Sequence, residues 1–78
     1  MTREDAIDRA KQLRKLEPGD EIMGATRRWV EIAKDPSQPG PILDILCWVV
    51  ELSGDYGPIA DLYIADETGD LVKSESYG

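Results

Sequence analysis

Carboxylates are the most abundant side chains in this sequence that could perform chemistry. The chain of 78 residues has 16 Asp and Glu, 9 Lys and Arg, no His and one Cys. Two carboxylates can work as acid and base when they lie about 5–9.5 Å apart in a cleft. A chain of this length forms one small domain with little room for a cleft, and His, the commonest general base, is missing. We therefore expect a single domain over residues 1–78, no enzyme, and no catalytic residues.

The acidic run at residues 66–70, Asp-Glu-Thr-Gly-Asp, has the composition of a calcium loop. An EF-hand loop needs ligands at alternating positions, Gly at position six and Glu at position twelve, and this run lacks that spacing. A hairpin turn with Gly69 at a positive φ explains the same residues. The sequence therefore predicts a turn here, and it predicts no metal and no cofactor.

Cys47 lies between Leu46 and Trp48 in the most apolar segment of the chain. A reactive thiol needs an electropositive and partly exposed setting, which the neighbouring residues do not provide. A single Cys forms no intramolecular disulfide. We expect Cys47 to be buried as a packing residue.

The candidate binding residues are two Trp and two Arg side chains. Trp29 follows Arg27 and Arg28, and Trp and Arg together are typical of protein-binding hot spots. Trp48 lies in an apolar segment, where a core position is the competing interpretation. The candidate protein-binding residues are therefore Arg27, Arg28, Trp29 and Trp48.

The net charge of −7 is unevenly distributed. Residues 1–34 sum to +1, whereas residues 35–78 hold nine acidic residues and one basic residue and sum to −8. Phosphate binding needs a basic surface, so we expect no nucleic-acid partner. An acidic surface of this kind also suits an inhibitor that mimics nucleic acid at a basic site.

The elements that position these residues begin with a helix predicted over residues 2–16. Thr2 caps it, and Pro18 and Gly19 stop it. Residues 21–34 fit two patterns: the apolar spacing suits a helix, whereas β-branched residues and Gly24 favour a strand. In a strand, Trp29 shares a face with Arg27 and Glu31.

The second half of the chain is predicted to be strands and turns. Three Pro and one Gly make residues 35–41 a loop. Strands follow over residues 42–52, 59–65 and 71–76, with turns at 53–58 and 66–70. Both faces of the 42–52 strand are apolar, so a face that the helix leaves open needs a dimer mate, a partner or the long loop to cover it.

Three segments together resemble the PepSY domain. They are Ala6-Ile7 with Ala10, the run Trp48-Val49-Val50, and the stretch 61–72 with its Thr68-Gly69 turn, although Ala65 and Asp66 stand in reverse order to the family pattern. The resemblance spans about residues 4–75. It implies one helix on an antiparallel sheet whose first strand is 22–34, and a non-enzymatic domain that binds proteins, including peptidases.

These observations define the expectations. We expect an α+β fold, with one N-terminal helix packed on an antiparallel meander sheet of three to four strands; the alternative is two helices followed by a three-stranded antiparallel sheet. We expect a protein-binding module with a peptidase as candidate partner; the alternatives are the acidic mimic and a structural homodimer subunit. No signal peptide or membrane-spanning run is visible, which predicts no membrane insertion and a cytoplasmic location, or an extracytoplasmic one if a leader was removed.

Overall fold

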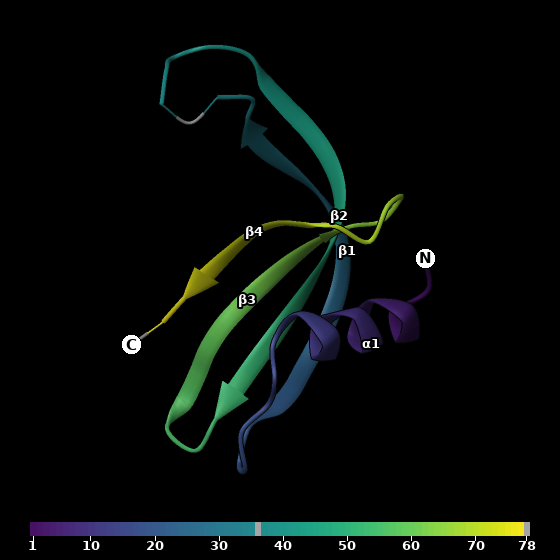
Figure 1. The fold of residues 1–78 in the computed structure, drawn as a ribbon, viewed down its shortest axis with the longest axis vertical. Helices are drawn as coiled ribbons and strands as arrows, with labels where there is room; N and C mark the ends of the chain where they lie inside the picture. Colours follow the sequence, from purple (N-terminus) through teal and green to yellow (C-terminus); the bar gives the residue numbers. More distant parts are fainter. Residues whose placement is uncertain (36, 78) are drawn as a thin grey trace.

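One helix and four strands make up the fold in a computed structural model that describes residues 1–35 and 37–77 (Figure 1). The elements are α1 Arg3–Leu13, β1 Glu21–Ala33, β2 Ile42–Gly54, β3 Gly57–Ala65 and β4 Leu71–Ser76. The strands form one antiparallel sheet in the order β1-β2-β3-β4. This α+β meander confirms the predicted fold class, and the alternative with two helices is wrong because residues 21–33 are a strand.

The helix begins as predicted and ends earlier. The Thr2 hydroxyl accepts a hydrogen bond from the Asp5 N–H (3.1 Å), and the Asp5 carboxylate accepts one from the Thr2 N–H (2.9 Å), which is a capping box. These bonds from the Thr2 backbone and side chain lower the pKa of Asp5. The predicted end at residue 16 is wrong, because Arg14 is already extended (φ −141°) and the segment after it carries Leu16 back to the core.

The main core lies between α1 and one face of the sheet. Ala6 and Ala10 are buried on the helix, and their small side chains allow α1 to approach the strands closely. Beneath them lie buried residues of β2 and β3, and these are Val50, Leu52, Ala60, Leu62 and Ile64. The i, i+4 spacing on the helix and the period-two spacing on the strands thus meet at one interface.

The opposite face of the sheet has a second, smaller cluster. Cys47 is fully buried there and Tyr63 is 5% exposed. The Arg28 guanidinium and the Lys73 ammonium lie 6.0 and 4.7 Å from the centre of the Tyr63 ring. The expectation that a mate, a partner or the loop 35–41 must cover this face is therefore wrong at these positions, because the chain's own basic side chains lie over it.

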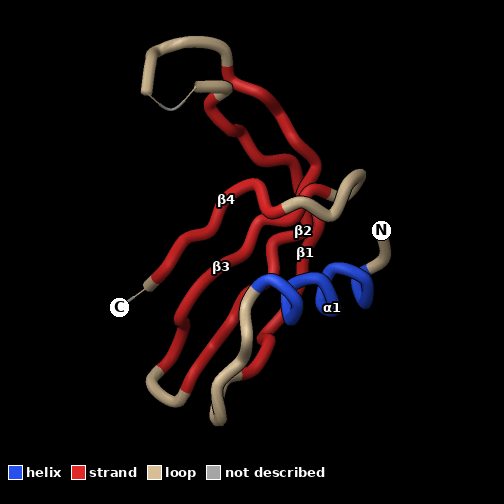
Figure 2. The backbone as a smooth tube through the Cα atoms, in the orientation of Figure 1, coloured by secondary structure: helices blue, strands red, loops and turns tan. Residues whose placement is uncertain are grey.

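The strands β1 and β2 extend beyond the rest of the sheet. β2 pairs with β3 only from Cys47 to Gly54, whereas its pairing with β1 continues to Ala33 opposite Ile42. We call residues 29–33 and 42–46 the arm, and we call the remainder of the helix and sheet the body. The arm projects away from α1 and contributes to a longest dimension of 40 Å (Figure 2).

The connections agree with the predictions in kind and differ in length. The described residues of the loop 35–41 join β1 to β2 at the tip of the arm. The predicted turn at 53–58 is wrong at its ends, because the strands run to Gly54 and restart at Gly57, whose φ is +113°. The predictions for β4 and for the turn at 66–70 are confirmed. No helix within residues 1–35 and 37–77 is long and apolar enough to cross a membrane.

Candidate functional site

The face of the arm that continues the helix-covered face of the body is exposed. Trp29 lies there with 68% of its surface accessible, and Ile42 with 62%. The strand register places Trp29 opposite Leu46, which is half-buried, and Ala33 opposite Ile42. Trp29 and Leu46 therefore lie side by side, and Ile42 lies beyond Asp44 on the same face, which nothing in the described chain covers. We call Trp29, Ile42, Asp44 and Leu46 the docking face.

The length of the helix explains why the docking face is open. Eleven residues of α-helix span about 16 Å. Thirteen residues of extended strand span about 43 Å. The helix also runs across the strands rather than along them (Figure 1). It therefore covers β1 and β2 near Ala25 and Val50 and leaves their far ends without a partner.

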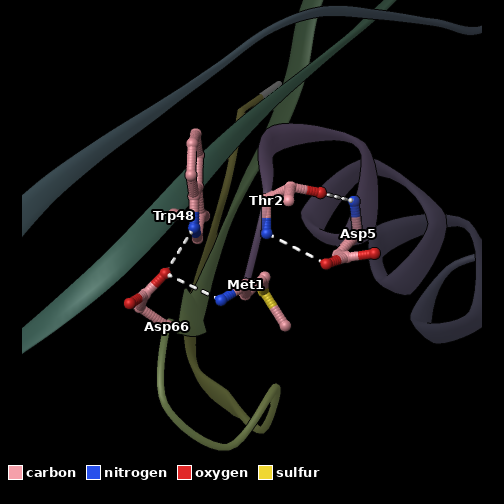
Figure 3. A network of polar contacts seen from close by, with 5 residues as sticks. All are labelled: Met1, Thr2, Asp5, Trp48 and Asp66. Carbon is pink, nitrogen blue, oxygen red and sulfur yellow. Dashed lines mark hydrogen bonds and ion pairs between the residues drawn. The ribbon is translucent and has the colours of Figure 1, made fainter.

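Trp48 lies at the junction between the body and the arm. Its indole N–H donates to the Asp66 carboxylate at 2.7 Å, and the Arg27 guanidinium lies 5.9 Å from its ring centre. The same Asp66 oxygen is 3.7 Å from the α-ammonium of Met1 (Figure 3). These contacts join β2, the β3–β4 turn and the start of the chain, and they fix the base of the arm.

The structure brings together three of the four predicted binding residues. Arg27, Trp29 and Trp48 lie on the helix side of the sheet, and Glu31 shares that side as the strand pattern predicts. Arg28 lies on the opposite side, over the ring of Tyr63. Trp48 is half-buried against the main core, whereas Trp29 is exposed. Their part in binding remains a prediction.

A groove of about 580 Å³ lies between the arm and the β3–β4 turn. Its largest apolar side chains are those of Trp29, Ile45, Leu46 and Val72. Its acidic lining comes from both sides, and these residues are Asp44, Asp66, Glu67 and Asp70. Sequence reasoning missed these four carboxylates because Asp44 and the β3–β4 turn are far apart in the chain and meet only in the folded structure.

The helix holds the β3–β4 turn in place beside the groove. Arg9 of α1 donates its Nε–H to the Gly69 carbonyl at 2.8 Å. The Gly69 N–H donates to the Ala65 carbonyl at 2.8 Å, and its φ of +77° is a conformation that glycine adopts without strain. The Asp70 carbonyl accepts from the Ala65 N–H at 2.9 Å. The turn is therefore a fixed wall of the groove.

The acidic residues of the second half fall in at least two separate places. One set lines the groove, as described above. On the opposite face of the sheet, Asp61 lies between Glu51 and Glu75 in the cross-strand register. There the Tyr77 hydroxyl donates to Asp61 at 2.6 Å, beside a second cavity of about 560 Å³. This distribution differs from the single contiguous acidic face that mimicry of nucleic acid requires.

Cys47 is buried as predicted. It is a free thiol with no exposed surface, and burial raises its pKa, so the thiol is held protonated. Among residues 1–35 and 37–77, no three His, Cys, Asp or Glu side chains come close enough together to hold a metal ion.

Comparison with known proteins returned no match: no family model, no curated protein and no solved structure is similar enough to this chain to be counted.

Proposed function

We propose that the protein is a non-enzymatic protein-binding module that contacts its partner through the docking face of the arm. The observation that carries the proposal is the exposure of Trp29, which has 68% of its surface accessible at the end of a projecting hairpin. Trp is the residue most enriched where protein interfaces concentrate their binding energy. Single exposed apolar residues are ordinary, but here Trp29 lies beside Leu46, and Ile42 lies further along the same face of the arm.

The surroundings of Trp29 also suit binding. The groove beside it has a fixed wall, because Arg9 holds the adjoining turn and Asp66 of that turn is bonded to the Trp48 indole. A binding site built on strands and a fixed turn loses little freedom when a partner docks. Arg27, close to Trp29 along β1, adds a cation at the rim of the same face. Trp29 is thus the proposed anchor, with Arg27 and Trp48 beside it.

A peptidase is the partner class that we propose. The support is the PepSY resemblance of the helix, of the Trp48 strand and of the Thr68-Gly69 turn, together with a helix-on-meander arrangement of the kind that the resemblance implies. In this proposal the module restrains its partner by occupying a surface of it and performs no chemistry of its own.

Affinity capture with matched variants tests the proposal. The tagged wild type is compared with Trp29→Ala and with Met23→Ala, which removes a side chain of similar exposure (60%) from the body end of the same strand. We expect a partner that the wild type and Met23→Ala recover equally and that Trp29→Ala loses. The recovered partner is then assayed for peptidase activity with and without the module. Equal recovery by all three proteins contradicts the proposed role of Trp29.

Light scattering separates this function from a structural homodimer. We expect a monomer at high protein concentration, because the docking face is proposed for a different protein. A stable dimer that Trp29→Ala dissociates would assign the docking face to a second copy of the chain instead.

A further inference from the structure

One edge of β2 has no neighbouring strand within the arm. β3 pairs with β2 as far as Ala65 opposite Cys47, and the Asp66 N–H then donates to the Leu46 carbonyl at 2.9 Å. Beyond that bond the chain turns away towards β4. Residues 42–45 therefore have β1 on one side and no strand among the described residues on the other.

The backbone groups at this edge are set by strand alternation. Successive residues of an antiparallel strand direct their N–H and C=O groups to alternate neighbours. The Leu46 carbonyl points to the β3 side, whereas the Pro41 carbonyl accepts from Lys34 on the β1 side. The N–H and C=O groups of Asp44 and Ile42 therefore point to the open edge. An extended peptide laid along the edge can bond to both residues.

The charge of the groove selects the occupant. Four carboxylates line it and no Lys or Arg does. Of these four, Asp66 alone has an ion-pair partner among residues 1–35 and 37–77, the α-ammonium of Met1. A second copy of this chain is a poor occupant, since antiparallel pairing centred on Asp44 places two carboxylates opposite each other, and each copy carries a net charge of −7. A basic segment meets the opposite charge.

We propose that the groove binds an extended, Lys- or Arg-containing segment of the partner as an added strand along residues 42–45. The inference rests on the proposed function and names the chemistry of the partner. Side chains of the added strand alternate between faces. Those on the face of Asp44 and Trp29 are basic and meet the carboxylates of the groove. Those on the other face are apolar and meet Ile45 and Val72.

Titration with model peptides tests the inference. The probe is an acetylated and amidated hexapeptide of alternating lysine and valine, and binding is followed by the fluorescence of the wild-type protein, in which Trp29 is the exposed tryptophan. The matched peptide has glutamate in place of lysine. We expect saturable binding of the lysine peptide that weakens as salt is added, and no binding of the glutamate peptide.

Two pairs of variants separate charge from backbone pairing. Asp44→Asn with Glu67→Gln removes two groove carboxylates, whereas Glu51→Gln with Glu75→Gln removes two on the opposite face. We expect the first pair to weaken binding about fivefold to tenfold and the second to leave it unchanged. Ile42→Pro removes an edge N–H that Ile42→Ala retains, so it should weaken binding more. Circular dichroism verifies that each variant is folded.

The outcomes are distinguishable. Equal binding of both peptides, or equal effects of the two carboxylate pairs, overturns the basic-strand inference. If a captured partner depends on Trp29 while the lysine peptide does not bind, the inference fails and the proposed function stands. If the captured partner is indifferent to Trp29 and the lysine peptide does not bind, both fail. A dimer that Asp44→Asn strengthens would assign the edge to a second copy and also overturn the inference.

Discussion

The same two strands, β1 and β2, lie in two different surroundings. In the body, their helix-side residues Ala25, Val50 and Leu52 pack beneath α1. In the arm, residues on that same side include Trp29 and Ile42, and both are largely exposed. The arm also carries the carboxylates Glu31 and Asp44 on that side, so its exposed face is partly charged. The two regions also differ in cover, because the helix crosses the strands and packs only on the body (Figure 1). An apolar strand face thus predicts a need for cover without saying what provides it.

The largest effect of a single substitution on stability is expected in the body. Leu52→Ala removes a large side chain that is 2% exposed beneath α1 and leaves a cavity. We expect the free energy of unfolding to fall by about 2–5 kcal/mol in chemical denaturation. Because a chain this short has a small core, the variant will be close to unfolded at room temperature. A loss below about 1 kcal/mol would mean that α1 does not cover Leu52 tightly.

A smaller effect on stability is expected at the β3–β4 turn, which lies beside the arm. Gly69→Ala puts a Cβ on a residue with φ +77° and within 3.2 Å of the Met1 methyl group. We expect a loss of about 1–2 kcal/mol in the free energy of unfolding, mainly from the left-handed backbone. Gly40→Ala is the control, since nothing lies within 4 Å of its Cβ position. Equal stability of the two variants would contradict the fixed turn.

The arm is expected to contribute little to stability. Trp29→Ala changes the free energy of unfolding by no more than about 0.5 kcal/mol, because the side chain is mostly in water in the folded protein. The comparison is the free energy of unfolding of Leu52→Ala, measured in the same chemical denaturation experiment. A loss of 2 kcal/mol or more for Trp29→Ala would show that the arm is part of the core and would remove the contrast between the regions.

The smallest expected effect is the pH dependence of one hydrogen bond at the C-terminal edge of the body, between Tyr77 and Asp61. The hydrogen bond from the Tyr77 hydroxyl to Asp61 raises the pKa of Tyr77 to about 12. The folded pKa lies above the usual tyrosine value of 10.0, so the stability that this bond contributes is complete below pH 10 and is lost as the pH rises towards 12. Ultraviolet titration should show one phenol ionising near pH 12 in the wild type and not in Tyr77→Phe. A wild-type titration complete near pH 10 would contradict this bond.

Local patterns predicted most of the elements. The Thr2 cap, the loop 35–41 in its described part and the strand 71–76 all depend on neighbours in the sequence. The helix end was wrong by three residues because Leu16 leaves the helix to reach the core, which is a tertiary demand. The β-branched content of residues 21–33 outweighed their helical spacing, since a strand is fixed by pairing with β2.

The candidate site was harder to predict than the fold. Trp29, Arg27 and Trp48 could be named from residue type and strand alternation. Arg28 was named with them and lies on the other face, as the period of two requires. The groove carboxylates were missed because Asp44 and residues 66–70 meet only through the early turn at Ala65, and no local pattern shows where a strand stops pairing.

Amide chemical shifts of the ¹⁵N-labelled protein, recorded as the lysine–valine hexapeptide is added, test the central claim most directly. The claim is that the arm binds while the body supports it. We predict shifts concentrated at residues 42–46, at Trp29 and at the 66–70 turn, with α1 and the Tyr77 edge unchanged. Shifts confined to the body, or none at saturating peptide, would contradict the claim.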